Sequence, residues 1–278
     1  MQPKRRAGFS STALALIPLA IALNIAGGQL IKTLRLPIYL DSIGTVLTGA
    51  LLGPWVGLVT GLLSNTIWTL SGLDQYALAF APVAGVVGLL AGFVGRAGLF
   101  QRSSPRWLSA VFGAVFLFAL TLFIMLFIYR NPDPNAFPAF PSAAELIQQQ
   151  PIIFILAIVA GAVGGYAVLQ RAGYTGISGL VVGFVAALVS APIATYVFGG
   201  VTGAGTDAIF AAFYATTQNI LASALAQGTV SDPFDKMSSF LIVWLILQSL
   251  PNRLLRRFPN ARTQPETPAP LVESAPLH

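Results

Sequence analysis

The 278-residue chain contains no cysteine and only one histidine, His278. The lack of cysteine excludes disulfides and thiolate metal sites. A single histidine cannot build a histidine metal cluster or a relay between histidines. We therefore expect no metal centre and no resident cofactor.

Charged residues are also scarce. They make up 9% of the chain, against about 25% in an ordinary soluble protein, while 55% of the residues are hydrophobic. A chain this apolar needs lipid as its solvent. Its net charge of +6 fits cytoplasmic loops rich in Lys and Arg, so no nucleic acid partner is expected.

Eight apolar runs are candidates for transmembrane helices, each of which needs roughly 20 residues. The run at 39–53 is short for a full span, and two re-entrant or peripheral runs would leave six spans. We expect an all-α, polytopic transmembrane bundle of about six to eight spans, forming one domain over residues 1–258. The runs cover residues 10–31, 39–53, 55–72, 77–98, 108–129, 151–170, 176–198 and 236–251.

The distribution of positive charge predicts the orientation. With eight spans and a cytoplasmic N-terminus, eleven of the fifteen Lys and Arg residues lie inside. The basic start and first apolar run imitate a secretory signal, but the long run favours an uncleaved span. We expect a multi-pass protein of the cell membrane with both termini in the cytoplasm. Residues 131–141 are rich in proline and predict a non-helical external loop, and residues 259–278 predict a disordered cytoplasmic tail.

Small residues recur at helical spacing. Gly49, Gly53, Gly57 and Gly61 form a ridge that lets helix backbones approach closely in lipid, interrupted by a turn at residues 53–54. Ala22 and Ala26 form a similar pair in the first run. Each pattern has two interpretations, packing within the chain or docking of a partner helix.

Polar residues at membrane depth are costly and mark candidate sites. Asp41 and Thr45 lie one helical turn apart at the start of the second run. Asp41 is either a binding residue or a helix cap. Asn65 and Trp68 share a face of the third run, where an amide beside an indole suits a flat heterocycle. Their alternative roles are an interhelical hydrogen bond and an interfacial anchor.

Two further polar clusters lie near the C-terminal half. Residues 199–207 are rich in glycine and end at Asp207, which either binds a ligand or caps a helix running to about Leu225. Asp235 and Lys236 stand at the predicted start of the last span and invite ion pairing, with helix capping as the alternative. The predicted topology brings all four clusters to the external half, which indicates a pocket open to the outside.

Several short segments resemble the substrate-binding S components of energy-coupling factor (ECF) transporters, over most of residues 10–258. They are residues 36–45 (LPIYLDSIGT), 53–57 (GPWVG), Gly61 with Asn65, 199–203 (GGVTG) with Asp207, 232–236 (DPFDK) and 250–253 (LPNR).

The resemblance implies high-affinity binding of a vitamin-like small molecule. It also implies partners, namely one membrane coupling subunit and two cytoplasmic ATPases. The family's docking face on the first helix corresponds here to Ala22 and Ala26. The family core has six helices, so residues from about 108 to 170 are expected to be inserted helices.

We thus expect a substrate-binding subunit of an ATP-driven micronutrient uptake transporter, without enzymatic activity or catalytic residues. The substrate-binding residues that we predict are Asp41, Thr45, Asn65, Trp68, Asp207 and Lys236. One alternative is a membrane sensor or receptor domain that signals through a partner. Another is an ion-coupled secondary transporter with Asp41 or Asp207 as the coupling carboxylate.

Overall fold

The computed structural model describes residues 11–34, 36–129 and 143–260, and these are helical with no strand. The prediction of an all-helical fold is confirmed. The helices within the described ranges are α1 (Ser11–Leu34), α2 (Ile43–Leu52), α3 (Pro54–Leu70), the 3-10 helix η1 (Ala77–Phe80), α4 (Ala81–Arg96), α5 (Arg106–Ile128), α6 (Ala143–Gln149), α7 (Pro151–Ala167), α8 (Gly173–Phe198), α9 (Asp207–Thr217), α10 (Ile220–Ser249) and α11 (Asn252–Leu255).

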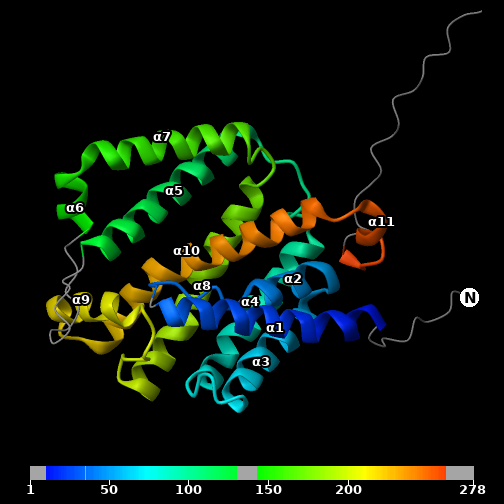
Figure 1. Ribbon diagram of the computed structural model, residues 1–278, viewed down its shortest axis with the longest axis horizontal. Helices are drawn as coiled ribbons and strands as arrows, with labels where there is room; N and C mark the ends of the chain where they lie inside the picture. Colours follow the sequence, from blue (N-terminus) through cyan, green and yellow to red (C-terminus); the bar gives the residue numbers. More distant parts are fainter. Residues whose placement is uncertain (1–10, 35, 130–142, 261–278) are drawn as a thin grey trace, which may run out of the picture.

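The helices form a bundle with a lateral layer. Helices α1 to α4 pack on one another, and α10 packs along α8 and also contacts α2. Helices α5 and α7 run side by side at one edge of the molecule (Figure 1), and α5 contacts α8. The segment expected to be an insertion thus forms this lateral layer, with the short α6 between its two long helices.

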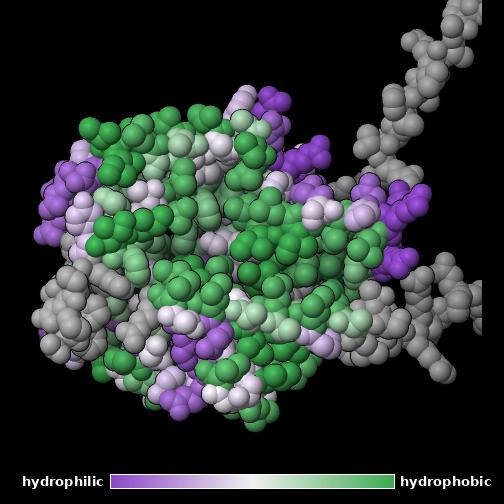
Figure 2. Space-filling model, in the orientation of Figure 1, coloured by the Kyte–Doolittle hydropathy of each residue, from purple (hydrophilic) through white to green (hydrophobic). Residues whose placement is uncertain are grey.

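The outer surface is unusually apolar. Large hydrophobic side chains point outward, for example Leu19, Trp107 and Leu188, which are 66%, 65% and 61% exposed. Figure 2 shows hydrophobic residues over most of one face. Among the described residues, four helical segments are long and apolar enough to cross a membrane. They are Ala15–Leu34, Ala77–Arg96, Arg106–Ile128 and Gly173–Phe198. Such a surface fits a membrane protein.

The helices agree with the predicted apolar runs except near the C-terminus. Helix α9 ends at Thr217, because Gln218 adopts a left-handed conformation with φ of 52°, so a helix continuing to Leu225 is wrong. Asn219 then caps α10 by accepting a hydrogen bond of 2.9 Å from the Ala222 amide. Helix α10 begins well before residue 236 as a result, and residues 232–236 lie in its middle rather than at its start.

The glycine ridge packs helices within the chain. A Cβ atom on Gly57 would lie 2.3 Å from the Gly88 carbonyl oxygen, and one on Gly61 would lie 2.2 Å from that of Ala84. Helices α3 and α4 therefore approach closely enough to exclude any side chain at these positions. Gly53 joins α2 to α3 with φ of 107°, a conformation that favours glycine.

A second close contact sets the position of α10. A Cβ atom on Gly183 of α8 would lie 2.3 Å from the Cα atom of Pro233. Since Pro233 follows Asp232 directly, this contact brings the Asp232 segment against α8, where Ser190 lies two turns further along the helix.

The predicted proline-rich loop at 131–141 lies outside the described residues. So does the predicted tail, apart from Pro259 and Asn260. The Asn260 side-chain amide donates to the Gly49 carbonyl oxygen at 3.3 Å, at the end of α2.

Candidate functional site

A cavity of about 130 Å³ lies inside the bundle. Its walls come from α1, the loop before α2, α3, η1, α4, α8, the glycine-rich loop before α9, and α10. The apolar part of the lining includes Ile31, Ile38, Phe80, Val83 and Val87. The polar and aromatic part consists of Lys32, Tyr39, Asp41, Ser42, Asn65, Trp68, Asp74, Tyr76, Ser190, Thr202, Asp232 and Lys236.

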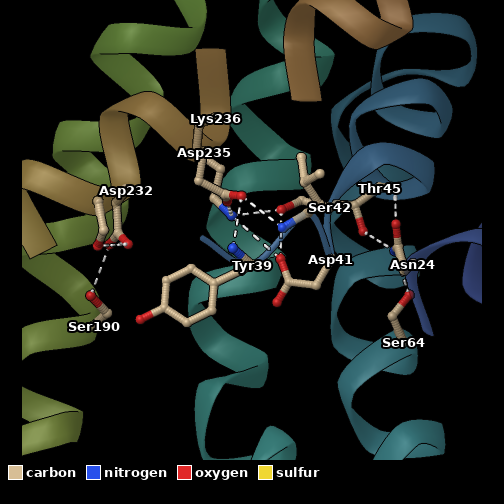
Figure 3. A network of polar contacts seen from close by, with 12 residues as sticks. Asn24, Tyr39, Asp41, Ser42, Thr45, Ser64, Ser190, Asp232, Asp235 and Lys236 are labelled. Atoms are coloured by element: carbon tan, nitrogen blue, oxygen red, sulfur yellow. Dashed lines mark hydrogen bonds and ion pairs between the residues drawn. The ribbon is translucent and has the colours of Figure 1, made fainter. Parts of the chain in front are cut away.

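Lys236 is the central cation of the site (Figure 3). Its ammonium group donates to Asp235 Oδ2 at 2.5 Å and to Ser42 Oγ at 2.6 Å. Asp41 Oδ1 lies further away, at 3.4 Å. Lys236 and Asp235 are both buried, so each charge depends on the other for compensation.

Asp235 also holds the loop that connects α1 to α2. Its Oδ1 atom accepts hydrogen bonds from the backbone amides of Leu40, at 2.7 Å, and Tyr39, at 3.1 Å. Leu40 has φ of 47°, a left-handed conformation that is costly for a residue with a side chain. The two amide bonds to Asp235 stabilise this loop against the middle of α10.

Tyr39 extends this connection to the glycine-rich loop. Its hydroxyl group is hydrogen-bonded to Thr206 Oγ1 at 2.8 Å and accepts a longer contact from Gln227 Nε2 at 3.4 Å. Burial raises the pKa of the Tyr39 phenol above its ordinary value, so the group stays protonated. Two loops that line the cavity are therefore joined through one side chain.

Asn65 and Trp68 both line the cavity, as their shared face on α3 requires. They are 4% and 5% exposed. Within the described ranges, the Asn65 amide has no hydrogen-bond partner, and the buried Nε1 atom of Trp68 has none either. A Cβ atom on Gly28 would lie 2.2 Å from the Trp68 ring, so this glycine makes the space in which the indole lies against α1.

Asp232 is a lining residue that the sequence-based selection missed. Asp232 is 5% exposed, and its carboxylate accepts only from hydroxyl groups among the described residues, at 3.2 Å from Ser190 Oγ and 3.4 Å from Ser231 Oγ. No Lys or Arg of the described chain lies within ion-pair distance of it. Asp232 lies four residues before Lys236, so the two would share a helix face if residues 232–236 were predicted to be helical. That spacing is the sequence signal that could have identified Asp232.

Thr45 does not line the cavity; it belongs to a buried polar network centred on Asn24. The Asn24 Nδ2 atom donates to Thr45 Oγ1 at 2.7 Å and to Ser64 Oγ at 2.8 Å. Its Oδ1 atom accepts from the Gly44 amide at 2.6 Å. Asn24 thus joins α1, α2 and α3 (Figure 3). The sequence signal that could have identified this network is a polar residue, Asn24, inside the first apolar run.

Asp207 also lies outside the lining. Its carboxylate accepts from the backbone amides of Thr202, at 3.0 Å, and Gly203, at 2.6 Å, and from Thr202 Oγ1 at 2.9 Å. These bonds close the glycine-rich loop, whose residues Thr202, Ala204 and Gly205 line the cavity. Asp207 is the first residue of α9 and not its cap, so neither predicted role describes it: its carboxylate acts on the cavity only through the loop.

The remaining features of the site lie at its edge. Lys32 and Asp74, both lining residues, form an ion pair of 2.8 Å between the end of α1 and the turn after α3. Ala22 and Ala26 are exposed on α1, away from the lining. Among the residues that the structure describes, no group of three or more His, Cys, Asp or Glu side chains is placed to hold a metal ion.

Comparison of the chain with models of protein families, with curated proteins and with solved structures found no match. The chemistry of the site therefore rests on its own geometry. A partly open, partly aromatic cavity with an amide and a carboxylate that lack strong partners is suited to binding a small polar molecule.

Proposed function

We propose that this chain is the substrate-binding subunit of an ATP-driven uptake transporter for a vitamin-like small molecule, similar to an ECF S component. The observation that carries the proposal is the cavity itself. It lies inside a bundle with an apolar exterior, and Asn65, Trp68 and Asp232 all line it. Intramembrane polar groups without strong partners are expected at substrate sites.

The proposal includes a multi-pass orientation in the cell membrane with six to eight spans and both termini inside. The start of α1 and the short α11 lie at the same end of the molecule's long axis, and α9 lies at the other end (Figure 1). This arrangement supports an outward-facing position for the glycine-rich loop and the cavity. The arginines of the α11 region then lie on the cytoplasmic side, as the positive-inside rule favours.

In this proposal the energy comes from partner subunits. The sequence has no nucleotide-binding loop of the Walker type, so ATP hydrolysis is assigned to two cytoplasmic ATPases that act through a membrane coupling subunit. Ala22 and Ala26 form the proposed docking face for that coupling subunit. Both are exposed on α1, which is consistent with this role.

An ion-coupled carrier is the second candidate, and Asp232 is the observation that favours it. A buried carboxylate without a cationic partner is the kind of group that binds a coupling proton or sodium ion. The two candidates differ in their energy source, so one experiment separates them.

The test measures co-purification and uptake in the native membrane. Tagged protein is expected to bring down ATPase subunits, and uptake of its substrate is expected to stop when ATP is depleted while the ion gradient is held. Replacing Ala22 and Ala26 by Leu should abolish co-purification without loss of ligand binding, because bulky side chains block close helix contact. Ala160→Leu, at an exposed alanine on α7, is the matched control and should change neither property.

ATP-independent uptake that collapses with the ion gradient contradicts the leading proposal and supports the carrier. If the variant with Ala22→Leu and Ala26→Leu retains the ATPases, the assignment of the docking face is contradicted, and the rest of the proposal is not affected.

A further inference from the structure

We propose that the cavity selects a small, planar, positively charged molecule of about one aromatic ring, with Asp232 as the counter-ion of its cationic group. This inference deepens the proposed function and rests on its claim that the cavity is a binding site. It names the ligand's charge and size, neither of which follows from the presence of a cavity.

The charged groups around the cavity do not balance. The cavity lining includes the carboxylates of Asp41 and Asp232 and the ammonium group of Lys236. Lys236 makes its shortest contacts with Ser42 and with Asp235, a third carboxylate that lies outside the lining. The other two charged lining residues, Lys32 and Asp74, compensate each other in an ion pair. Three carboxylates against one ammonium group leave an excess of negative charge, so a cation is favoured and an anion is repelled.

Asp232 is a buried carboxylate without a cationic partner among the described residues. The residue is 5% exposed, and two hydroxyl contacts longer than 3 Å replace little of the water that its carboxylate loses on burial. Figure 3 shows Asp232 with Ser190, separate from the group formed by Lys236, Asp41 and Ser42. A buried carboxylate is ordinarily paired. A cationic ligand group beside Asp232 and Ser190 supplies the missing partner.

Trp68 and Asn65 are uncharged lining residues that offer a ligand further contacts. Trp68 presents an aromatic surface, on which a planar cation gains both apolar contact and cation–π attraction. Asn65 adds an amide that is buried, lines the same cavity and has no partner in the described part of the chain. The amide atoms of Asn65 are accessible from the cavity, so a polar ligand can hydrogen-bond to them.

The volume of the cavity indicates the size of the ligand. The cavity of about 130 Å³ is slightly smaller than an engineered cavity of roughly 150 Å³ that holds benzene. The enclosed part of the cavity is therefore on the scale of one aromatic ring, and a larger ligand would extend through its opening.

The test compares three probes of similar size and different charge. The purified chain in lipid nanodiscs is titrated calorimetrically with 4-aminopyridine, which is cationic at neutral pH, with neutral aniline and with anionic benzoate. We expect the cation to bind at least about tenfold more tightly than aniline, and benzoate to show no binding, since repelling or unpaired charges cost at least this much.

Variants assign the selectivity to one residue. Asp232→Asn should weaken binding of the cation by about thirtyfold or more, because it removes the buried charge of the pair, and should change aniline binding by less than about threefold. Glu145→Gln makes the same chemical change on α6, outside the lining, and should leave all three affinities as they are.

Equal or tighter binding of aniline or benzoate, or no binding of the cation, overturns the inference. Unchanged cation binding by Asp232→Asn also overturns it, because Asp232 is then not the counter-ion. The ranking of the probes on the unaltered chain needs no variant, so it decides the question even if Asp232→Asn folds poorly. The titration needs no ATPase, so the proposed function fails separately, through the co-purification and uptake test.

Discussion

Asn24 and Gly28 lie one helical turn apart on α1 and serve different parts of the molecule. Asn24 satisfies polar groups on α2 and α3, while Gly28 makes room for the indole of Trp68. Neither was selected from the sequence. An asparagine inside an apolar run has many possible partners, and the partner that makes a glycine necessary lies forty residues away.

Asn24→Ala should destabilise the fold, because it leaves the hydroxyl groups of Thr45 and Ser64 and the Gly44 amide without their shared partner. We expect a loss of about 3 kcal/mol in the free energy of unfolding, on the scale of about 1–3 kcal/mol for each unsatisfied buried group. Steric trapping in nanodiscs measures it. Thr66→Ala, whose hydroxyl bonds only within α3, is the control and should cost under about 1 kcal/mol. Equal losses contradict the network.

Gly28→Ala should displace the Trp68 ring, since the new Cβ atom would lie 2.2 Å from it. The indole then moves into the cavity, and ligand affinity should fall by about tenfold or more, as expected for lost complementarity in a close-packed site. Tryptophan fluorescence and calorimetry measure the two effects. Gly164→Ala on α7 is the control, because a Cβ atom there meets nothing within 4 Å. Unchanged affinity in Gly28→Ala contradicts the placement of the indole.

At the scale of elements, apolar periodicity located the helices well, because long runs of hydrophobic residues favour helices in lipid. It failed where polar chemistry decides the boundary. Asn219 begins α10 inside a segment with no strong hydrophobic signal, and Gln218 ends α9 by adopting a positive φ. The middle of α10 was therefore mistaken for the start of a helix.

The loop between α1 and α2 is held by α10 through the pair of Asp235 and Lys236, and this gives the element-scale prediction. Lys236→Met leaves Asp235 buried without its cation and should lower the free energy of unfolding by about 3–5 kcal/mol. Steric trapping again provides the measurement.

Lys32→Met is the matched control. It breaks the Lys32–Asp74 ion pair, in which Lys32 is 34% exposed, and should cost about 1 kcal/mol or less. Similar losses for the two variants would mean that the pair on α10 is solvated rather than buried.

At the scale of the whole molecule, the sequence predicted the helical class and part of the cavity. Asp41, Asn65, Trp68 and Lys236 all line it. The sequence-based selection grouped them because the expected topology brought their polar clusters to one side of the bundle. The roles of Thr45 and Asp207 could not be separated from binding, because a hydroxyl or carboxylate that satisfies the protein's own backbone carries the same sequence signal as one that meets a ligand.

The central claim is that this cavity holds a small molecule in the membrane-embedded bundle. Its most direct test is mass spectrometry of small molecules released from protein purified out of its native membrane, beside a variant with Asn65→Ala and Trp68→Ala. The account predicts one small cationic molecule at near-stoichiometric amount with the unaltered chain, and its loss from a variant that still folds and inserts. The same molecules in the same amounts with both proteins, or none with either, would contradict it.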